Sequence, residues 1–455
     1  MPKTVQDDTH LFYQSRLRRP TLERAQGIYM WDTDDKRYID GSSGAMVSNI
    51  GHSDPAVLAA MRQQMERATF GYRLHFETEV SEAMARATAE RMPAGLDKVF
   101  FVSGGSEAVE SCLKFARQWA LATEQPQKWK VISRFPSYHG STLGALAITG
   151  MDVMTEPFAP MLQSMPKIPA PTCYLDQDDL SLEERGLRYA EYLRDEILRQ
   201  GPETVLAFIM EPIGGASTGA LVAPDSYQQR IQAICREFDI LLICDEVMTG
   251  GGRTGRFLGG DHWQLQPDLI AISKGFAAGY APLGAMVARN EMVEAVLDAG
   301  GFIHGFTYAG NPLACAAGLA VLEQLEQRQL VQHAATQGTL LKQALQHLQR
   351  RYPFIGDVRG KGLLLAFELM SDPISKAPLP VELNAFNRLV DIAYDNGLII
   401  YSRRTRGGSK GDHFMVCPPL IISDAQIDEL IGLLDKSLLQ FAQEAKLPVD
   451  QGAAA

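Results

Sequence analysis

The sequence predicts an α/β protein built on a mostly parallel, doubly wound sheet. Between residues 98 and 289, short apolar runs alternate with longer segments of helical periodicity, and this alternation is typical of such a sheet. Two of the runs, 240–247 and 269–275, are continuous and apolar until they end in ionisable side chains. Continuous apolar runs indicate strands that are buried on both faces. After residue 330, strands and helices are bunched together, which indicates a second, smaller α+β domain.

The elements before this region are expected to be a hairpin, a loop and two helices. Residues 28–40 alternate in polarity around an Asp-Asp turn, which is typical of a hairpin. The Gly- and Ser-rich segment 40–52 is expected to be a loop. Helical periodicity covers residues 55–67 and 81–92, and Pro93 ends the second helix.

The alternating region and the C-terminal region complete the predicted elements. Strands are expected at 98–102, 129–134, 205–210, 240–245, 269–273 and 283–288, and helices at 106–122, 182–200 and 226–238. Two further helices are expected from 312 into the 320s and near 330–350. Strands at 360–370 and 396–402 and a closing helix at 425–443 follow.

This order of elements predicts the division of the chain. With 455 residues, the chain is long enough for two or three domains. Residues 53–328 are expected to form the large domain and residues 329–447 the smaller one. The N-terminal segment 1–52 is expected to contribute to the smaller domain, and the polar tail 448–455 to be disordered.

Composition and charge exclude several classes of partner. A formal net charge of −11, with 43 Lys and Arg spread along the chain, gives no indication of a nucleic-acid partner. No apolar run of about 18 residues is present and the N-terminus has no apolar signal region, so no membrane partner is expected. Six cysteines without CxxC spacing are typical of buried free thiols, which favours the cytoplasm. No metal site is predicted.

An acid and an amine end the two continuous apolar runs. Asp245 and Lys274 are expected at carboxyl ends of strands, where open α/β sheets bind their ligands. A pyridoxal 5'-phosphate (PLP) enzyme needs this pair, because the lysine forms a Schiff base and the acid keeps the pyridine nitrogen protonated. Taken singly, Asp245 could cap a helix and Lys274 could be a surface charge.

A phosphate-binding loop is predicted at residues 102–107, VSGGSE, which follow a strand and open a helix. Two glycines let the backbone approach a ligand, and the free N–H groups of a helix N-terminus attract an anion. An ordinary capped helix is the alternative interpretation. Because the loop is neither a Walker A motif nor a GxGxxG motif, ATP and NAD are not favoured.

The segments 245–257, DEVMTGGGRTGRF, and 272–285, ISKGFAAGYAPLGA, resemble the class III aminotransferases. This family includes the ω-amino acid, ornithine, γ-aminobutyrate and amine transaminases. The resemblance extends from about residue 27 to about residue 434, and it implies the PLP-dependent transferase fold type I.

The resemblance also implies roles for individual residues. Gly105 and Ser106 would contact the cofactor phosphate, an aromatic Tyr138 would stack on the pyridine ring, and Glu211 would lie near the cofactor hydroxyl. Thr307, in GFTYAGNP, would reach the phosphate of a neighbouring subunit, which makes the active site shared and the protein a homodimer or a homotetramer. The implied cofactor-binding residues are Gly105, Ser106, Tyr138, His139, Glu211, Asp245, Val247, Lys274 and Thr307, with no proton-transfer role for His139.

Substrate-binding residues are implied in three segments. Met46 occupies a position that carries Trp in some amine transaminases, and Tyr72 lies in a segment that forms a pocket wall. A late arginine would bind the keto-acid carboxylate in a bidentate manner. Arg403, Arg404 and Arg406 all lie in an extended basic loop that precedes the GD and PP pairs. Arg403 is preferred, and a solvated basic loop is the alternative.

The implied activity is transfer of an amino group from an amine or ω-amino acid to pyruvate or 2-oxoglutarate by a ping-pong mechanism. A decarboxylase, aminomutase or racemase of the same fold is an alternative enzyme class. A non-catalytic protein of this fold is a third class, but the presence of Lys274 argues against it.

Overall fold

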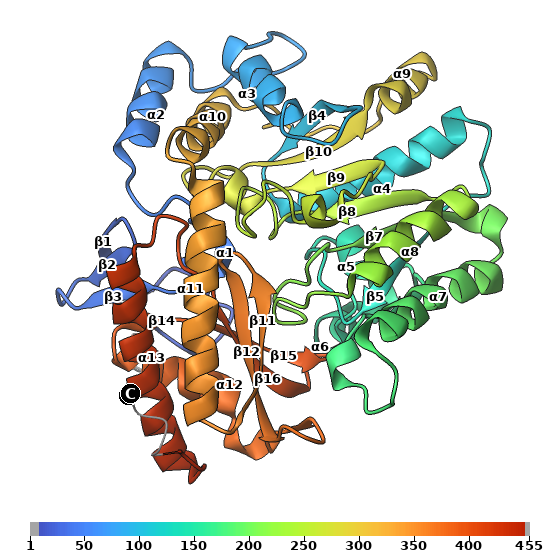
Figure 1. Cartoon of the computed structure of the whole chain (residues 1–455). Coiled ribbons are helices and arrows are strands. Elements are labelled where there is room, and N and C mark those ends of the chain that lie inside the picture. Colours follow the sequence, from blue (N-terminus) through green and yellow to red (C-terminus); the bar gives the residue numbers. More distant parts are fainter. Residues whose placement is uncertain (1–8, 451–455) are drawn as a thin grey trace.

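A seven-stranded sheet forms the centre of the computed structural model, which describes residues 9–450 (Figure 1). Its strand order is β4-β10-β9-β8-β7-β5-β6. All neighbours are parallel except β10, which is antiparallel to both β4 and β9. The strands are β4 (Leu96–Val102), β5 (Lys130–Phe135), β6 (Lys167–Pro169), β7 (Val205–Met210), β8 (Leu241–Asp245), β9 (Leu269–Ile272) and β10 (Gly284–Arg289). The mostly parallel α/β prediction is therefore confirmed.

Helices cover both faces of this sheet, so every residue of β7 and β8 is buried. The long helices are α4 (Gly105–Ala122), α7 (Leu182–Gln200), α8 (Asp225–Glu237), α9 (Asn290–Asp298) and α10 (Pro312–Gln327). Shorter ones are α5 (Leu143–Ala147) and α6 (Asp152–Thr155). The 3₁₀ turns are η1 (Glu156–Met161), η2 (Cys173–Leu175), η3 (Pro202–Thr204), η4 (Gly259–Trp263), η5 (Lys274–Phe276) and η6 (Val381–Leu383).

The chain before the sheet follows the predicted pattern, with two additions. Helix α2 (Pro55–Arg67) begins where expected, because Asp54 accepts hydrogen bonds from the Ala56 and Val57 N–H groups and Pro55 occupies the first turn. Helix α3 is Glu79–Ala89. The hairpin is formed by β2 (Tyr29–Asp32) and β3 (Arg37–Asp40). Strand β1 (Leu22–Gln26) and the short helix α1 (Ser43–Met46) were not predicted.

Two smaller sheets lie beside the central one. Strand β14 (Leu398–Ile399) pairs in parallel with β3 and completes the sheet β1-β2-β3-β14. The other sheet contains β11 (Ile355–Lys361), β12 (Leu364–Asp372), β16 (Lys410–Val416), β15 (Tyr401–Arg406) and the two-residue β13 (Ala377–Pro378). Helices α11 (Leu330–Arg351), α12 (Ala385–Asp395) and α13 (Asp424–Ala445) accompany them. The β3–β14 pairing supports assigning residues 1–52 to the smaller domain, whose boundaries stay a prediction.

Two predictions for the C-terminal region were wrong. Residues 360–370 are not one strand, because Gly362 adopts a φ of +54° and begins the turn between β11 and β12. The predicted basic loop is strand β15, paired with β16 through Arg403–His413 and Arg404–Asp412. At the start of the tail predicted to be disordered, Val449 packs on the core and the Asp450 N–H donates to the Arg351 carbonyl. Residues 451–455 of that tail lie outside the described residues, so their disorder stays a prediction. Residues 1–8, where no apolar signal region was found in the sequence, also lie outside the described residues.

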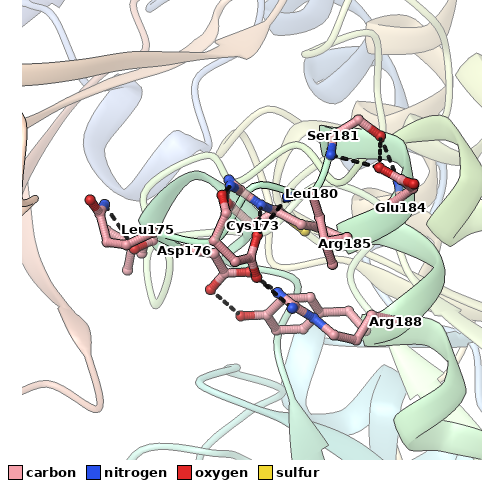
Figure 2. A network of polar contacts seen from close by, with 11 residues as sticks. Cys173, Leu175, Asp176, Leu180, Ser181, Glu184, Arg185 and Arg188 are labelled. Carbon is pink, nitrogen blue, oxygen red and sulfur yellow. Dashed lines mark hydrogen bonds and ion pairs between the residues drawn. The ribbon is translucent and has the colours of Figure 1, made fainter.

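The entry into α7 is held by a surface network (Figure 2). Ser181 and Glu184 form a reciprocal capping box at its first turn. Arg188 pairs with Asp176 at 2.7 Å, and Arg185 donates to the Cys173 carbonyl at 3.1 Å. These contacts fix the chain that returns from the edge of the sheet to α7.

Among residues 9–450, no helix combines the length and apolar character needed to cross a membrane.

A buried arginine connects segments that are far apart in the sequence. Arg253 is 0% exposed. Its Nη1 donates to the carbonyls of Leu363, Cys417 and Pro418 at 3.2, 3.3 and 2.5 Å. Its Nη2 donates to Ser43 and Asn49 at 3.0 and 2.7 Å. Burial lowers the pKa of Arg253 to about 10, although Cys417 and Asp40 oppose this shift.

We expect Arg253→Met to destabilise the fold by about 3 kcal/mol or more. The variant keeps an apolar stem but leaves several buried acceptors unpaired, and each costs roughly 1–3 kcal/mol. Chemical denaturation monitored by circular dichroism measures the loss. Arg236→Met, at an exposed position of α8, is the matched control and should change stability by less than about 0.5 kcal/mol. Equal effects of the two variants would contradict this role of Arg253.

Candidate active site

A cavity of about 140 Å³ lies at the carboxyl end of the central sheet. The strands β5, β7, β8 and β9 all run in the same direction, so the residues that follow them meet at one edge. Eight predicted cofactor-binding residues line the cavity: Gly105, Ser106, Tyr138, His139, Glu211, Asp245, Val247 and Lys274. The structure therefore brings together residues that are spread over 170 positions of the chain, from 105 to 274.

The N-terminus of α4 forms one wall of this cavity. A Cβ at Gly105 would lie 2.7 Å from Val247 Cγ1, and a Cβ at Gly140 would lie 2.8 Å from Ser106 Oγ. Only glycine fits such close approaches. Ser106 Oγ accepts a hydrogen bond from the Ser141 N–H at 3.0 Å, which fixes the two loops together. The first N–H groups of an 18-residue helix thus face a narrow, glycine-lined cradle suited to a phosphate.

Asp245 is buried and is held by two partners. Its Oδ1 accepts a hydrogen bond from the Val247 N–H at 3.1 Å, and its Oδ2 lies 2.8 Å from His139 Nδ1. The His139 ring is buried, and its Nε2 has no hydrogen-bond partner among the described residues. The pair fixes the direction of the carboxylate, so Asp245 is presented to the cavity in one orientation.

Glu211 is a second buried carboxylate in the cavity wall. Its Oε1 accepts from the Gly215 N–H at 3.1 Å, and its Oε2 lies 3.5 Å from Arg134 Nη2. Arg134 also donates to the Glu211 carbonyl at 2.6 Å. Burial raises the pKa of Glu211, although His139 and Arg134 oppose this effect. A buried carboxylate needs a partner, and Arg134, a residue that the sequence did not indicate, supplies it.

Lys274 stands at the turn that follows β9 and begins η5, with a φ of +51°. Its Nζ has no hydrogen bond or ion pair among residues 9–450. Burial lowers the pKa of Lys274, and the charges of Asp245 and Glu211 oppose this shift. A lysine without a partner at the wall of a cavity is available for reaction with a carbonyl group.

Four predicted residues lie outside the cavity lining. Met46 is 1% exposed and packs in one apolar cluster with Ile213, which does line the cavity. Tyr72 packs against His75 at 5.1 Å, and Thr307 is exposed. Arg403 is exposed and lies 4.5 Å from the centre of the Tyr401 ring.

The other two arginines of β15 are engaged elsewhere. Arg404 pairs with Asp412 at 2.8 Å, and Arg406 donates to the Lys376 carbonyl at 2.5 Å. Burial raises the pKa of Tyr401. The charge of Arg403 opposes this shift, and Tyr138 adds to it. Tyr401 thus responds both to Arg403 and to the cavity residue Tyr138.

Four further cavity residues were not predicted: Gly140, Ile213, Ala216 and Met248. Three of them, Gly140, Ile213 and Met248, lie one or two residues after predicted site residues. Their position near the same strand ends could therefore have indicated them from the sequence. Ala216 follows a loop that no local pattern connects to the cavity. Three of the four are apolar, which gives one wall a hydrophobic surface.

The residues of this cavity fit PLP. The glycine cradle at α4 can take the phosphate, and Asp245 can hold a proton on the ring nitrogen. Tyr138 offers an aromatic face, and Lys274 has a free amine. Each of these groups is on the cavity wall and none is blocked by another ion pair, apart from the His139 contact that orients Asp245.

Comparison with known proteins agrees with this geometry. The family model "Aminotransferase class-III" matches residues 13–438. An uncharacterised aminotransferase, YodT, of Bacillus subtilis is 36% identical over 94% of this chain and 96% of its own length. The putrescine–pyruvate aminotransferase of Pseudomonas aeruginosa is 35% identical over 92% of this chain and 91% of its own length.

Solved structures give the same result. An (S)-enantioselective ω-transaminase from Thermomicrobium roseum has a TM-score of 0.89 and 37% identity, covering 95% of this chain and 96% of that one. The ω-transaminase of Pseudomonas jessenii, in complex with PMP, has a TM-score of 0.88 and 33% identity over 94% of both chains. The fold is thus the PLP-dependent transferase fold type I. This protein belongs to the class III aminotransferases, a family of PLP-dependent enzymes.

Proposed function

We propose that Lys274 and Asp245 carry the amino transfer from an amine or ω-amino acid to a keto acid. The observation that supports this most is their position in one cavity with the glycine cradle of α4. The cavity wall formed by Ile213, Ala216 and Met248 is apolar. Lys274 is the one Lys or Arg among the residues described as lining the cavity. The apolar wall therefore suits the uncharged carbon chain of a donor.

The mechanism assigns one task to each side chain. Bound PLP supplies an electron sink for the carbon that loses its proton. The Lys274 amine, favoured in its neutral form by burial, would take the proton from the donor carbon and deliver it to the cofactor carbon that becomes bonded to the amino nitrogen. In the second half of the cycle, with the keto acid, it would move a proton in the opposite direction. Asp245 retains a proton on the ring nitrogen, and His139 keeps the Asp245 carboxylate in place. The N–H groups of α4 bind the phosphate.

A panel of amines tested with pyruvate and with 2-oxoglutarate examines this proposal. Without a keto acid, each subunit should release about one equivalent of carbonyl product and then stop, as a ping-pong transaminase must. Adding either acceptor should restore turnover. Continued product formation without an acceptor, or release of carbon dioxide, would instead indicate another PLP-dependent reaction.

We expect Arg403→Ala to raise KM for the keto acid by about ten- to 100-fold, since a hydrogen bond to a charged group contributes roughly 1.5–3 kcal/mol. Arg403 is exposed, stacks on the Tyr401 ring, and forms no ion pair among the described residues. Arg404→Ala is the matched control, because Arg404 is already paired with Asp412. KM for an uncharged amine should stay unchanged in both. An unaltered keto-acid KM in Arg403→Ala would remove this residue from acceptor binding.

We further propose a homodimer with shared active sites; a homotetramer built from such dimers also fits. Large apolar side chains are exposed around Thr307, and the Phe70 and Tyr308 rings lie 6.0 Å apart. Leu74 and Ile303 are both 78% exposed. A surface of this kind is typical of an interface between subunits.

We expect Thr307→Val to weaken PLP retention by about tenfold, the effect of one lost hydrogen bond to a charged group. The choice of amine donor should not change. Dilution of the wild-type protein towards the monomer should release cofactor and activity together. Equilibrium dialysis and analytical ultracentrifugation measure both effects. A monomer that keeps its PLP and full turnover would contradict the shared site.

A cytoplasmic location is also part of the proposal. All six cysteines are buried and none forms a disulfide. Free thiols of this kind are typical of proteins in a reducing compartment.

A further inference from the structure

Four basic side chains line a second cavity, of about 450 Å³, that shares no residue with the active-site cavity. Arg256 and His262 come from the segment between β8 and β9. Lys342 lies on α11, and Lys361 ends β11. Figure 1 shows α11 running beside β11. No acidic side chain is among the lining residues.

The four basic groups have no carboxylate partner. Among residues 9–450, none of them forms an ion pair within 4.0 Å. Lys342 Nζ donates to the Gly360 carbonyl at 3.2 Å, and His262 Nε2 lies 3.1 Å from the Thr254 carbonyl. Lys361 Nζ lies 5.6 Å from the centre of the Trp263 ring. In a protein with a net charge of −11, a cavity with only basic ionisable groups is a local region of positive potential.

Nearby acidic residues are already engaged. Asp357 pairs with Arg359 at 2.7 Å. Asp261 accepts a hydrogen bond from the Leu258 N–H at 3.0 Å, although its charge also interacts with Arg256. Neither residue lines the cavity. The positive charge is therefore not neutralised from within the cavity.

The basic groups also act on one another. Burial lowers the pKa of His262, and the charges of Lys361 and Arg256 lower it further. Burial and the charge of Lys361 likewise lower the pKa of Lys342, and the charge of Asp357 opposes this shift. This mutual repulsion agrees with the position of the four groups around one cavity. An anion placed in that space would relieve the repulsion between them.

Part of the cavity wall is made of closely packed backbone. A Cβ at Gly338 would lie 2.2 Å from the Gly362 carbonyl oxygen, and a Cβ at Gly255 would lie 2.9 Å from Ala335 Cβ. These contacts hold α11 against the β11–β12 turn and against the segment that carries Arg256. The concave shape is therefore built by backbone packing and does not require a ligand to form it.

We propose that this cavity binds a phosphate-bearing small anion with at least two negative charges. Lysine ammonium groups attract phosphate as point charges, and a guanidinium such as that of Arg256 can bind it in a bidentate manner. The volume is within the range of small-molecule sites, about 300–1,000 Å³. A ligand there would contact two separate parts of the chain, 254–262 and 342–361.

Calorimetric titration of the PLP-loaded enzyme with inorganic pyrophosphate tests the proposal. We expect one saturable site per subunit. The double variant Lys342→Gln/Lys361→Gln should weaken binding by about tenfold or more, because the site loses two positive charges that attract the anion. The single variant Arg256→Gln, at an exposed position, should weaken it in the same direction. Lys436→Gln, at an exposed position of α13, is the matched control and should bind as the wild type does.

Two further measurements distinguish binding at this site from binding at the active site. The absorbance of bound PLP should not change during the titration, because the active-site cradle is already filled by cofactor. Amino transfer by the double variant should equal that of the wild type, so the outcome does not depend on the proposed function. The proposal is overturned by the absence of saturable binding, by unchanged affinity in the double variant, or by equal affinity for malonate, which would indicate a general carboxylate site.

Discussion

Replacing Lys274 by alanine should abolish amino transfer while leaving the protein folded. Loss of proton transfer alone removes about 10²–10⁴-fold of rate, and loss of the covalent link to the cofactor adds to it. The phosphate cradle at Gly105 and Ser106 is untouched, so the variant should still bind some PLP. Borohydride reduction and peptide mapping should place the pyridoxyl group on Lys274 in the wild type and nowhere in the variant.

The same variant carries a stability prediction with a defined sign. Burial lowers the pKa of Lys274 in the folded chain, so the unfolded chain binds more protons between that pKa and the ordinary lysine value of about 10.4. Stability of the cofactor-free wild type should therefore rise with pH through this window, and Lys274→Ala should remove that contribution. Lys130→Ala is a matched control at a lysine outside the cavity, and it should retain turnover. In the borohydride experiment, a pyridoxyl group on any other lysine would overturn the assignment of Lys274.

Replacing Asp245 by asparagine should lower kcat by about 10²–10³-fold, the range found when one electrostatic contact to a developing charge is removed. Asparagine can still accept from the Val247 N–H, so the loop should keep its conformation. It cannot balance a protonated pyridine nitrogen, and the carbanion loses its electron sink. Steady-state kinetics with saturating PLP measures the effect.

His139 provides the comparison for this variant. His139→Asn removes the ring that holds Asp245 at 2.8 Å but keeps the carboxylate, so its loss of kcat should be smaller than that of Asp245→Asn. The two changes combined should cost less than the sum of their separate effects, since both act through one contact. A wild-type rate in Asp245→Asn would exclude this carboxylate from the mechanism.

Buried, continuous elements are predictable from their residues alone. Strand β7 and helix α2 occupy the predicted ranges 205–210 and 55–67, because an apolar run and a proline-capped periodic segment each allow one local structure. Strand β6 was missed because only three residues pair, one of them a proline at the edge of the sheet. Strand β15 was mistaken for a loop because its three arginines and the glycines that follow look irregular, although Ser402 and Thr405 are buried.

The residues of the candidate site likewise fall into those that the sequence could predict and those that it could not. Residues directly after parallel strands, such as Asp245 and Glu211, could be placed because topology brings strand ends together. Arg134 could not be placed, because its contact with Glu211 joins positions 77 residues apart. Likewise, no local pattern shows that Arg404 has a carboxylate partner and Arg403 does not.

The pairing of β3 with β14 has a consequence for biosynthesis. Ile39 lies opposite Leu398, so the sheet that contains β3 lacks its fourth strand until residues 398 and 399 are made. At about 5–20 residues per second, translation of the intervening chain takes on the order of tens of seconds. During that interval the edge of β3 is open to pairing with other strands. Closing so long a loop also makes this one of the slower contacts to form. The hairpin of β2 and β3 thus leaves the ribosome long before β14, the strand that completes its sheet.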